Sequence, residues 1–220
     1  MEEDPSISQD KMDVIVKTIK NYPIDSNCFI LYTNYNSDCI VVDPGTESCE
    51  ELLFFLRQNN LVPNHVILTH EHFDHIWGVN KILELFNSTL VCSEKCLELI
   101  ADKKKNLSIF YDQVGFEILP RNVKVVSDEM ITLGDYVLRF REILGHSLGS
   151  VSFWINDLLF SGDLIIKDTK TVTKLPGGSK EQLVKTFQQL KELFYQKNIF
   201  VYPGHGETFY FDDIDFNKIV

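Results

Sequence analysis

A short segment with four potential metal ligands constrains this chain more than any other part of its sequence. The segment reads HVILTHEHFDHIWG, and it places His70, His72, Asp74 and His75 directly after an apolar run. A single histidine after a strand is more often a turn or core residue than a ligand. Three imidazoles and a carboxylate so close together are instead typical of a metal site, because Zn²⁺ and similar ions prefer these groups. The segment therefore predicts a strand that ends in a metal-binding loop.

Three more potential ligands follow other apolar runs. His146 lies in EILGHS, Asp163 in LLFSGD and His205 in IFVYPGHG. Rigid strands can position polar side chains at their ends, where loops alone would leave those side chains mobile. We therefore expect four strand ends to converge at one edge of a sheet.

The number of these groups fits two metal ions. A zinc-like ion takes three or four ligands at about 2.0 to 2.2 Å, and a two-metal site holds its ions about 3.5 to 4 Å apart through shared oxygen ligands. Five imidazoles and two carboxylates suit that number. His70 and His72 are two positions apart and can point to one side of an extended turn, whereas Asp74 and His75 can reach a second ion.

Apolar runs that alternate with amphipathic stretches predict the secondary structure. Runs rich in Val, Ile, Leu and Phe and bounded by Gly, Asp, Asn or Pro are typical of strands. We expect strands at Cys28–Tyr32, Cys39–Val42, His65–Thr69, Thr89–Cys92, Tyr136–Leu144, Val151–Ile155, Leu158–Phe160 and Ile199–Tyr202.

Two sequence patterns predict where helices begin. Ser48 with Glu51, and Ser179 with Gln182, place a hydroxyl and a side-chain acceptor where free backbone donors need them. The second helix carries an apolar stripe that predicts packing on a sheet, formed by Leu183, Phe187, Leu190 and Phe194. The alternation of strands and helices predicts an α/β fold with a mixed sheet. We expect one domain over residues 12–220, preceded by a flexible polar tail at residues 1–11.

Charge and cysteine usage narrow the class of protein. The formal net charge is −11, which repels phosphate backbones and argues against a nucleic-acid partner. The five cysteines include no CxxC pair, and the chain opens with Met1-Glu2-Glu3-Asp4-Pro5, which does not resemble a secretion signal. No apolar run approaches the length that spans a bilayer. We therefore expect a reduced, cytoplasmic protein without a membrane partner, in which the cysteines are packing residues.

Four motifs, in this order, resemble those of the metallo-β-lactamase-fold hydrolases: HxHxDHxxG at His70–Gly78, Gly145-His146-Ser147, Ser161-Gly162-Asp163 and Pro203-Gly204-His205-Gly206. The chain is most similar to the glyoxalase II-like, or hydroxyacylglutathione hydrolase-like, branch, which Leu175-Pro176-Gly177-Gly178 also matches. The resemblance covers residues from about 13 to 210. It implies an αββα sandwich, with two mixed sheets flanked by helices and the site at one edge.

The resemblance also implies a role for each candidate ligand. The first metal ion would be held by His70, His72 and His146, the second by Asp74, His75 and His205, and Asp163 would bridge the two. Asp43 matches an early strand-end Asp of the family, and it either orients a ligand or forms an Asp-Pro-Gly turn. His65 matches no motif, and we expect a structural role for it.

The activity that the resemblance implies is hydrolysis. Two divalent ions, which we expect to be Zn²⁺ with iron or manganese as alternatives, lower the pKa of a bridging water to about 7 and produce a hydroxide. This hydroxide would attack an ester in a small-molecule substrate, and we expect a thioester or a lactone. Asp74 or Asp163 would steer the hydroxide or transfer a proton, which makes them the candidate catalytic residues.

Two departures from the glyoxalase II-like pattern argue against glutathione. Thr171, Val172 and Lys174 stand where that branch carries a Gly-Arg pair and an Asp. Only fifteen residues follow His205, so we expect no C-terminal helical domain of the kind that helps to bind glutathione.

A different reaction class is the alternative. Persulfide dioxygenases share these motifs but use one iron, which His70, His146 and Asp163 would hold with open positions for oxygen and a thiolate. Three other functions rank lower. The expected absence of an export signal argues against a secreted β-lactamase, and the lack of a basic arm argues against a tRNA-processing nuclease. A scaffold that has lost its metal is disfavoured because all seven ligands remain.

Overall fold

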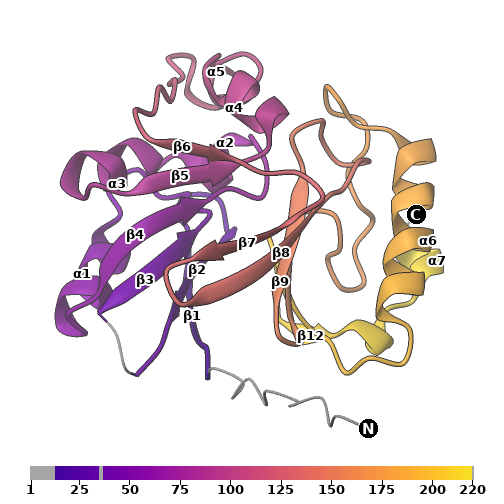
Figure 1. The fold of residues 1–220 in the computed structure, drawn as a ribbon. Helices are drawn as coiled ribbons and strands as arrows, with labels where there is room; N and C mark the ends of the chain where they lie inside the picture. The colour runs from indigo at the N-terminus through magenta and orange to yellow at the C-terminus, as the bar shows by residue number, and fades with distance from the viewer. Residues whose placement is uncertain (1–12, 35–36, 220) are drawn as a thin grey trace, which may run out of the picture.

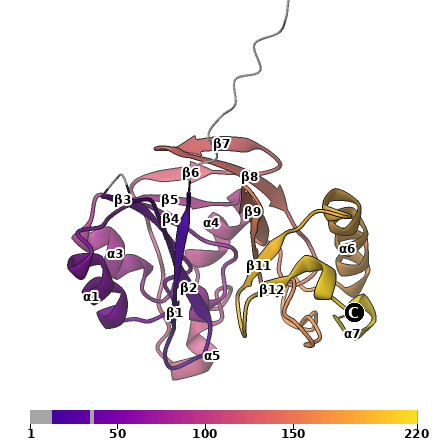
Figure 2. The same cartoon turned by 90° about the horizontal axis from the view of Figure 1, so that it is seen from below.

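Two β-sheets lie face to face, and helices cover the outer side of each (Figure 1). The structure is a computed structural model that describes residues 13–34 and 37–219, so the expected tail at residues 1–11 lies outside the described residues. Seen from below, α1 (Glu50–Gln58) and α3 (Val79–Leu85) flank one sheet, and α6 (Lys180–Phe194) flanks the other (Figure 2). The predicted sandwich of two mixed sheets between helices is therefore confirmed.

The first sheet contains the strands of the N-terminal half. Its strand order is β1-β2-β3-β4-β5-β6, with β1 (Ile15–Lys20), β2 (Asn27–Tyr32), β3 (Asp38–Val42), β4 (Val62–Ile67), β5 (Thr89–Cys92) and β6 (Val123–Val125). The first three strands pair antiparallel, and β3 to β6 pair parallel. Parallel neighbours need a crossover, and helices lie in each of these crossovers: α1 in the first, α2 (Phe73–Ile76) and α3 in the second, α4 (Glu94–Ile100) and α5 (Ser108–Asp112) in the third.

The second sheet is built from the C-terminal half. Its strand order is β12-β11-β10-β9-β8-β7, with β7 (Met130–Leu133), β8 (Tyr136–Glu142), β9 (Val151–Ile155), β10 (Leu158–Gly162), β11 (Phe200–Pro203) and β12 (Phe209–Tyr210). Only β10 and β11 pair parallel among these strands, and α6 forms the crossover between them. A 3-10 turn (Phe211–Asp213) and α7 (Phe216–Ile219) follow β12.

Alternation along the strands separates the hydrophobic core into layers. In β2, Phe29 and Leu31 face the second sheet, whereas Cys28 and Ile30 face the helices of the first. This is the period of two that a strand with two buried faces requires. Between the sheets Phe29 of β2 packs edge-to-face against Phe160 of β10, with ring centroids 5.4 Å apart. The contact fixes the two sheets against each other beneath the strand ends that carry the candidate ligands.

The two predicted helix starts have different outcomes. The Ser179 hydroxyl accepts a hydrogen bond from the Gln182 amide at 3.3 Å and caps α6 as expected. The predicted cap at Ser48 is wrong, because α1 begins one residue later, after Cys49, and no side chain caps it. Cys49 has φ 52°, a left-handed backbone conformation that turns the chain into the helix directly. The apolar stripe of α6 is buried, as predicted.

The predicted strands all appear: Thr89–Cys92 and Val151–Ile155 have the predicted bounds, and the ends of the others differ by up to three residues. His65 lies inside β4, which agrees with a structural role. The five cysteines are buried and free, which agrees with packing. Four strands were not predicted, namely β1, β6, β7 and β12. Over the described ranges, no helix is long and apolar enough to cross a membrane.

Candidate metal centre

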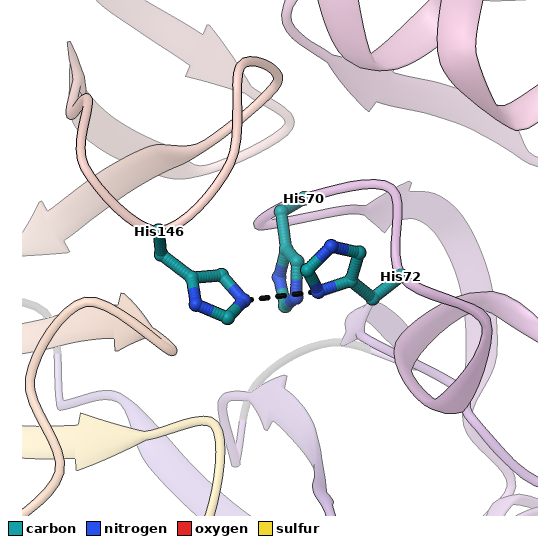
Figure 3. A group of neighbouring side chains, drawn as sticks. All are labelled: His70, His72 and His146. Atoms are coloured by element: carbon teal, nitrogen blue, oxygen red, sulfur yellow. Dashed lines mark hydrogen bonds between the residues drawn. The ribbon is translucent and has the colours of Figure 1, made fainter. Parts of the chain in front are cut away.

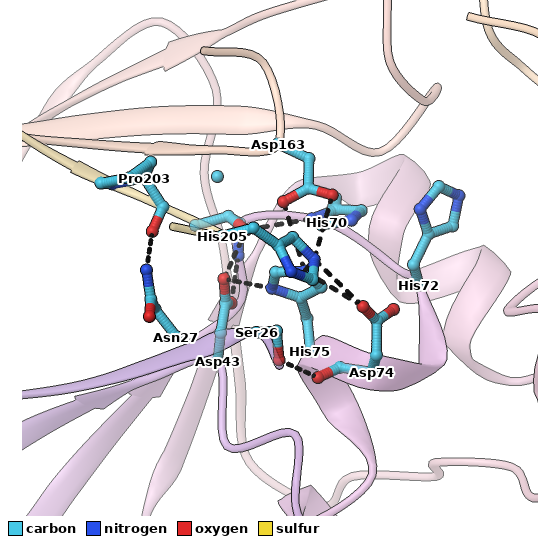
Figure 4. Close-up of polar contacts among 12 residues, drawn as sticks. Ser26, Asn27, Asp43, His70, His72, Asp74, His75, Asp163, Pro203 and His205 are labelled. Carbon is cyan, nitrogen blue, oxygen red and sulfur yellow. Dashed lines mark hydrogen bonds and ion pairs between the residues drawn. The ribbon is translucent and has the colours of Figure 1, made fainter. Parts of the chain in front are cut away.

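The candidate ligands gather where four strands end. His70, His72, Asp74 and His75 follow β4, and the other three follow β8, β10 and β11 as His146, Asp163 and His205. Figure 4 shows ligands from both sheets, among them Asp163 and His205 beside His75. The structure thus brings the seven predicted residues together, although they are scattered over the chain.

His70, His72 and His146 form the first group. One nitrogen of each ring lies within 4.8 Å of those of the others, and all three side chains are buried. Nε2 of His146 lies 2.9 Å from Nδ1 of His72 (Figure 3). Nε2 of His70 is buried and has no hydrogen-bond partner within the described residues. Imidazole nitrogens that converge in this way are the usual donors to zinc-like ions.

Asp74, His75 and His205 form the second group. Nε2 of His205 lies 3.2 Å from Oδ2 of Asp74 and 3.4 Å from Nε2 of His75. The third pair, Nε2 of His75 and Oδ2 of Asp74, is separated by 3.7 Å. Asp74 and His75 come from the same first turn of α2, so one short segment supplies two donors.

Asp163 lies between the two groups. Its Oδ2 atom is 3.7 Å from Nε2 of His146 in the first group and 3.6 Å from Nε2 of His205 in the second. Its Oδ1 atom is 3.3 Å from Nε2 of His75. A carboxylate in this position can offer an oxygen to two ions at once, which is the arrangement of a two-metal site.

Asp43 orients two of the histidines. It accepts from Nδ1 of His75 at 3.1 Å and from the Thr69 hydroxyl at 2.6 Å. Because that hydroxyl gives its proton to Asp43, it can only accept from Nδ1 of His70, 3.0 Å away. Both rings then carry their proton on Nδ1 and leave Nε2 free. Of the two interpretations of Asp43, the structure favours the one in which it orients ligands.

Backbone carbonyls orient two further histidines. Nδ1 of His146 lies 2.9 Å from the carbonyl of Val172, and Nδ1 of His205 lies 2.8 Å from the carbonyl of Asp25. A carbonyl oxygen only accepts, so the proton is on Nδ1 in each ring. The free Nε2 lone pairs therefore face the site from both groups.

The pKa values of the histidines are shifted in opposite directions in the two groups. Burial lowers the pKa of His70, of His146 and of His72, the last to about 3. In the second group the nearby carboxylates outweigh burial, so that Asp163 and Asp74 raise the pKa of His75. The surrounding imidazoles, His75 first, likewise outweigh burial and hold the pKa of Asp163 well below its usual range. The first group is neutral at pH 7 and ready to donate to a cation.

The donor set fits two divalent cations. The first group places neutral imidazoles with free lone pairs on one side of Asp163. The second group places a carboxylate and two imidazoles on the other side. Such a concentration of lone pairs in a buried site is costly unless positive charge compensates it. The backbone also makes room for the site, because a Cβ atom on Gly204 would overlap Oδ1 of Asp163.

Sequence reasoning missed the residues that orient the ligands. Thr69 directly precedes His70 and was assigned only to a strand end, although a threonine beside a ligand is a possible acceptor for its ring. The carbonyls of Asp25 and Val172 leave no signal in the sequence, because any residue type supplies one.

Comparison with known proteins supports this arrangement. A family model described as "Metallo-beta-lactamase superfamily" matches residues 21–205. "Probable metallo-hydrolase YqgX" of Bacillus subtilis is 28% identical over 186 residues, covering 84% of this chain and 86% of the relative. A protein named "Hydroxyacylglutathione hydrolase" from Serratia proteamaculans is 31% identical over 167 residues, covering 76% of this chain but only 57% of that protein.

Solved structures share the fold. "Crystal structure of BLEG-1 B3 metallo-beta-lactamase" aligns with a TM-score of 0.82 at 27% identity, over 90% of this chain and 95% of that one. "Crystal structure of TTHA1623 in a di-iron-bound form" aligns with a TM-score of 0.77 at 25% identity, over 90% of this chain and 96% of that one.

Proposed function

The chain belongs to the metallo-beta-lactamase superfamily, and we propose that within it this protein is a hydrolase that cleaves an ester bond in a small molecule, a thioester or a lactone in particular. The observation that carries the proposal is the position of Asp163 between two complete groups of ligands. A single-ion site has no need of the second group, formed by Asp74, His75 and His205.

Two ions held by these groups would lower the pKa of a bound water to about 7 and would provide positive charge for the carbonyl oxygen of the substrate. Side chains of the protein would bind the ions and orient the water. Asp163 is buried and kept ionised by the imidazoles around it, so it can bind cations on both sides. Asp74 faces His205 from the same region and is ionised as well, because His75 and His205 outweigh the effect of burial and lower its pKa. Either carboxylate can accept a hydrogen bond from the attacking water and so orient it.

The preference for a thioester or lactone over other esters rests on the resemblance to the glyoxalase II-like branch. The relative from Serratia proteamaculans is named for a glutathione thioester, but this chain spans little more than half of it. Two of the three positions that depart from that branch serve the structure here. The Thr171 hydroxyl donates to the Leu164 carbonyl at 2.7 Å, and the Val172 carbonyl orients His146. We therefore propose a thioester or lactone without assigning glutathione.

Zn²⁺ is our proposal for the metal. Three imidazoles in one group, and two imidazoles with a carboxylate in the other, are the ligands that this ion prefers in hydrolases. The same donors also accept iron and manganese, and a relative of the same fold has been solved with two irons.

Elemental analysis followed by substrate assays tests the proposal. The purified protein should hold two ions per chain, and the Zn²⁺-loaded form should hydrolyse members of a panel of thioesters and lactones. Protein stripped with a chelator should lose that activity and regain it when Zn²⁺ is returned. One iron per chain with oxygen uptake on a persulfide, or two ions per chain with no turnover of any ester, would overturn it.

A further inference from the structure

Glu71 is a buried carboxylate between two candidate ligands, and the proposed mechanism does not use it. Its side chain is 2% exposed, and it stands between His70 and His72 in the sequence. The groups of possible metal ligands within the described residues do not include it. A buried carboxylate lowers stability unless hydrogen bonds compensate it, so its presence at this position needs an explanation.

The hydrogen bonds of Glu71 connect two segments that carry ligands. Its Oε2 atom accepts from the Ser147 hydroxyl at 2.9 Å, and the backbone amide of Gly149 also donates to the carboxylate. Ser147 directly follows His146. The carboxylate that follows His70 is therefore bonded to the residue beside the ligand that completes the first group.

A backbone bond attaches the C-terminal side of the segment from Gly145 to Ser150 to the end of β4, because the Val151 amide donates to the Thr69 carbonyl at 2.8 Å. The Ser93 hydroxyl donates to the Gly149 carbonyl at 2.8 Å, and the hydroxyls of Ser147 and Ser150 lie 2.7 Å apart. A Cβ atom on Gly149 would lie 2.5 Å from Oε2 of Glu71, so the backbone approaches the carboxylate closely. Glu71 therefore adds a side-chain link that lies nearer to His146 along the chain than the backbone bond from Val151 to Thr69.

We propose that Glu71 is a positioning residue that sets the distance between His146 and His72 and thereby the affinity of the first group for its metal ion. The inference rests on the proposed two-metal site. Nε2 of His146 and Nδ1 of His72 lie 2.9 Å apart, a separation that suits donors to one ion. Without the hydrogen bonds from Ser147 and Gly149 to Glu71, the segment of His146 is held less tightly against the segment of His72, and the first group becomes looser than the second.

Metal withdrawal from the loaded protein tests this role. Wild type and the variants Glu71→Ala, Glu71→Gln and Ser147→Ala are loaded with Co²⁺ and titrated with a chelator. The shifted imidazole N–H signals in the NMR spectrum report which histidines keep their ion, after assignment with His72→Ala and His205→Ala. Glu192→Ala, an exposed glutamate of α6, is the matched control.

We expect Glu71→Ala to weaken the first ion about 10- to 100-fold and to leave the second ion as in wild type. Glu71→Gln keeps an oxygen that accepts from Ser147, so it should recover most of the affinity. Ser147→Ala removes the bond from the hydroxyl but keeps the bond from the Gly149 amide, so it should weaken the first ion less than Glu71→Ala does. The double variant should be no weaker than Glu71→Ala, because that change already removes the bond to Ser147.

The inference is overturned if Glu71→Ala binds the first ion as tightly as wild type. It is also overturned if both ions weaken equally while the thermal midpoint of the metal-free protein falls, because Glu71 then supports the fold alone. A wild-type protein that binds no second ion contradicts the proposed function instead, so the two failures are distinguishable.

Discussion

The carboxylate of Asp43 accepts two hydrogen bonds from Thr69, one from its backbone amide at 2.8 Å and one from its hydroxyl at 2.6 Å. The pair joins the ends of the parallel strands β3 and β4. The second oxygen of Asp43 also accepts from His75, so one buried carboxylate orients a ligand of each group, His75 directly and His70 through Thr69.

Replacing Asp43 tests this arrangement. Asp43 has φ 50°, which Asn tolerates better than other residues, so Asp43→Asn should leave the fold intact. The amide offers one acceptor where the carboxylate offers two, and His75 or Thr69 loses its partner. We expect metal affinity to fall about 10- to 100-fold, measured by chelator competition. Asp212→Asn, an exposed site, is the control, and equal affinity in both variants would refute the role of Asp43.

Thr69→Val removes the hydroxyl but keeps the backbone bond to Asp43. The Nδ1 proton of His70 then lacks its acceptor, and we expect the ion of the first group to bind more weakly, with the second ion much less affected. Thr69→Ser retains the hydroxyl and should restore the affinity. Chelator titration of the loaded variants measures this, and a serine variant as weak as the valine variant would contradict the explanation.

Asp163→Ala should abolish turnover while the fold remains. The carboxylate lies between both groups, so its loss removes the shared donor and one candidate acceptor for the proton of water. We expect kcat/KM to fall by about 10²- to 10⁴-fold or more. Circular dichroism checks the fold, and elemental analysis checks whether metal is lost with activity. Full activity of the variant would remove Asp163 from the proposed mechanism.

The lowered pKa of His72 makes the metal-free protein sensitive to acid. Burial first, and the charge of His146 next, lower this pKa to about 3, from 6.5 in the unfolded chain. Between these two values the unfolded chain binds a proton that the folded chain does not, so stability falls as pH falls. In His72→Asn the slope of unfolding free energy against pH should be flatter by up to about 1.4 kcal/mol per pH unit. Urea unfolding with metal removed measures both slopes, and parallel curves would contradict the prediction.

The two predicted helix starts provide a matched pair of stability variants. Ser179 caps α6, and Ser179→Ala should lower the free energy of unfolding by about 1 kcal/mol. Ser48 is exposed and caps nothing, so Ser48→Ala should stay within about 0.5 kcal/mol of wild type. Denaturant unfolding compares the two, and an equal loss in both would argue against the difference between the helix starts.

The sequence predicts those helices and strands whose pattern of buried residues repeats over neighbouring positions of the chain. The strand runs and the stripe of α6 are visible because burial repeats along one element. The strands β6 and β12 are three and two residues long, too short to display any period. The edge strand β1 is only partly buried and carries two lysines, so its apolar residues form no continuous run.

The candidate site likewise has a part that the sequence predicts, its ligands, and a part that it does not, the contacts that orient them. Its ligands are visible because three imidazoles and a carboxylate cluster directly after one apolar run, and because the order of the motifs is specific. The contacts that orient those ligands are invisible for a physical reason. Asp25 and His205 are 180 positions apart, and Glu71 and Ser147 are 76 apart, so only the folded chain brings them together.

His70, His72 and His75 follow a strand of the first sheet, whereas His146, Asp163 and His205 follow strands of the second. Every ion bound by these groups is therefore a cross-link between the two halves of the molecule. Removal of the metal ions should allow the two sheets to separate transiently at this edge. The amides of β4 and β10 should then exchange with deuterated solvent faster than those of β2. The exchange rates of these backbone amides would therefore report whether the metal centre is occupied.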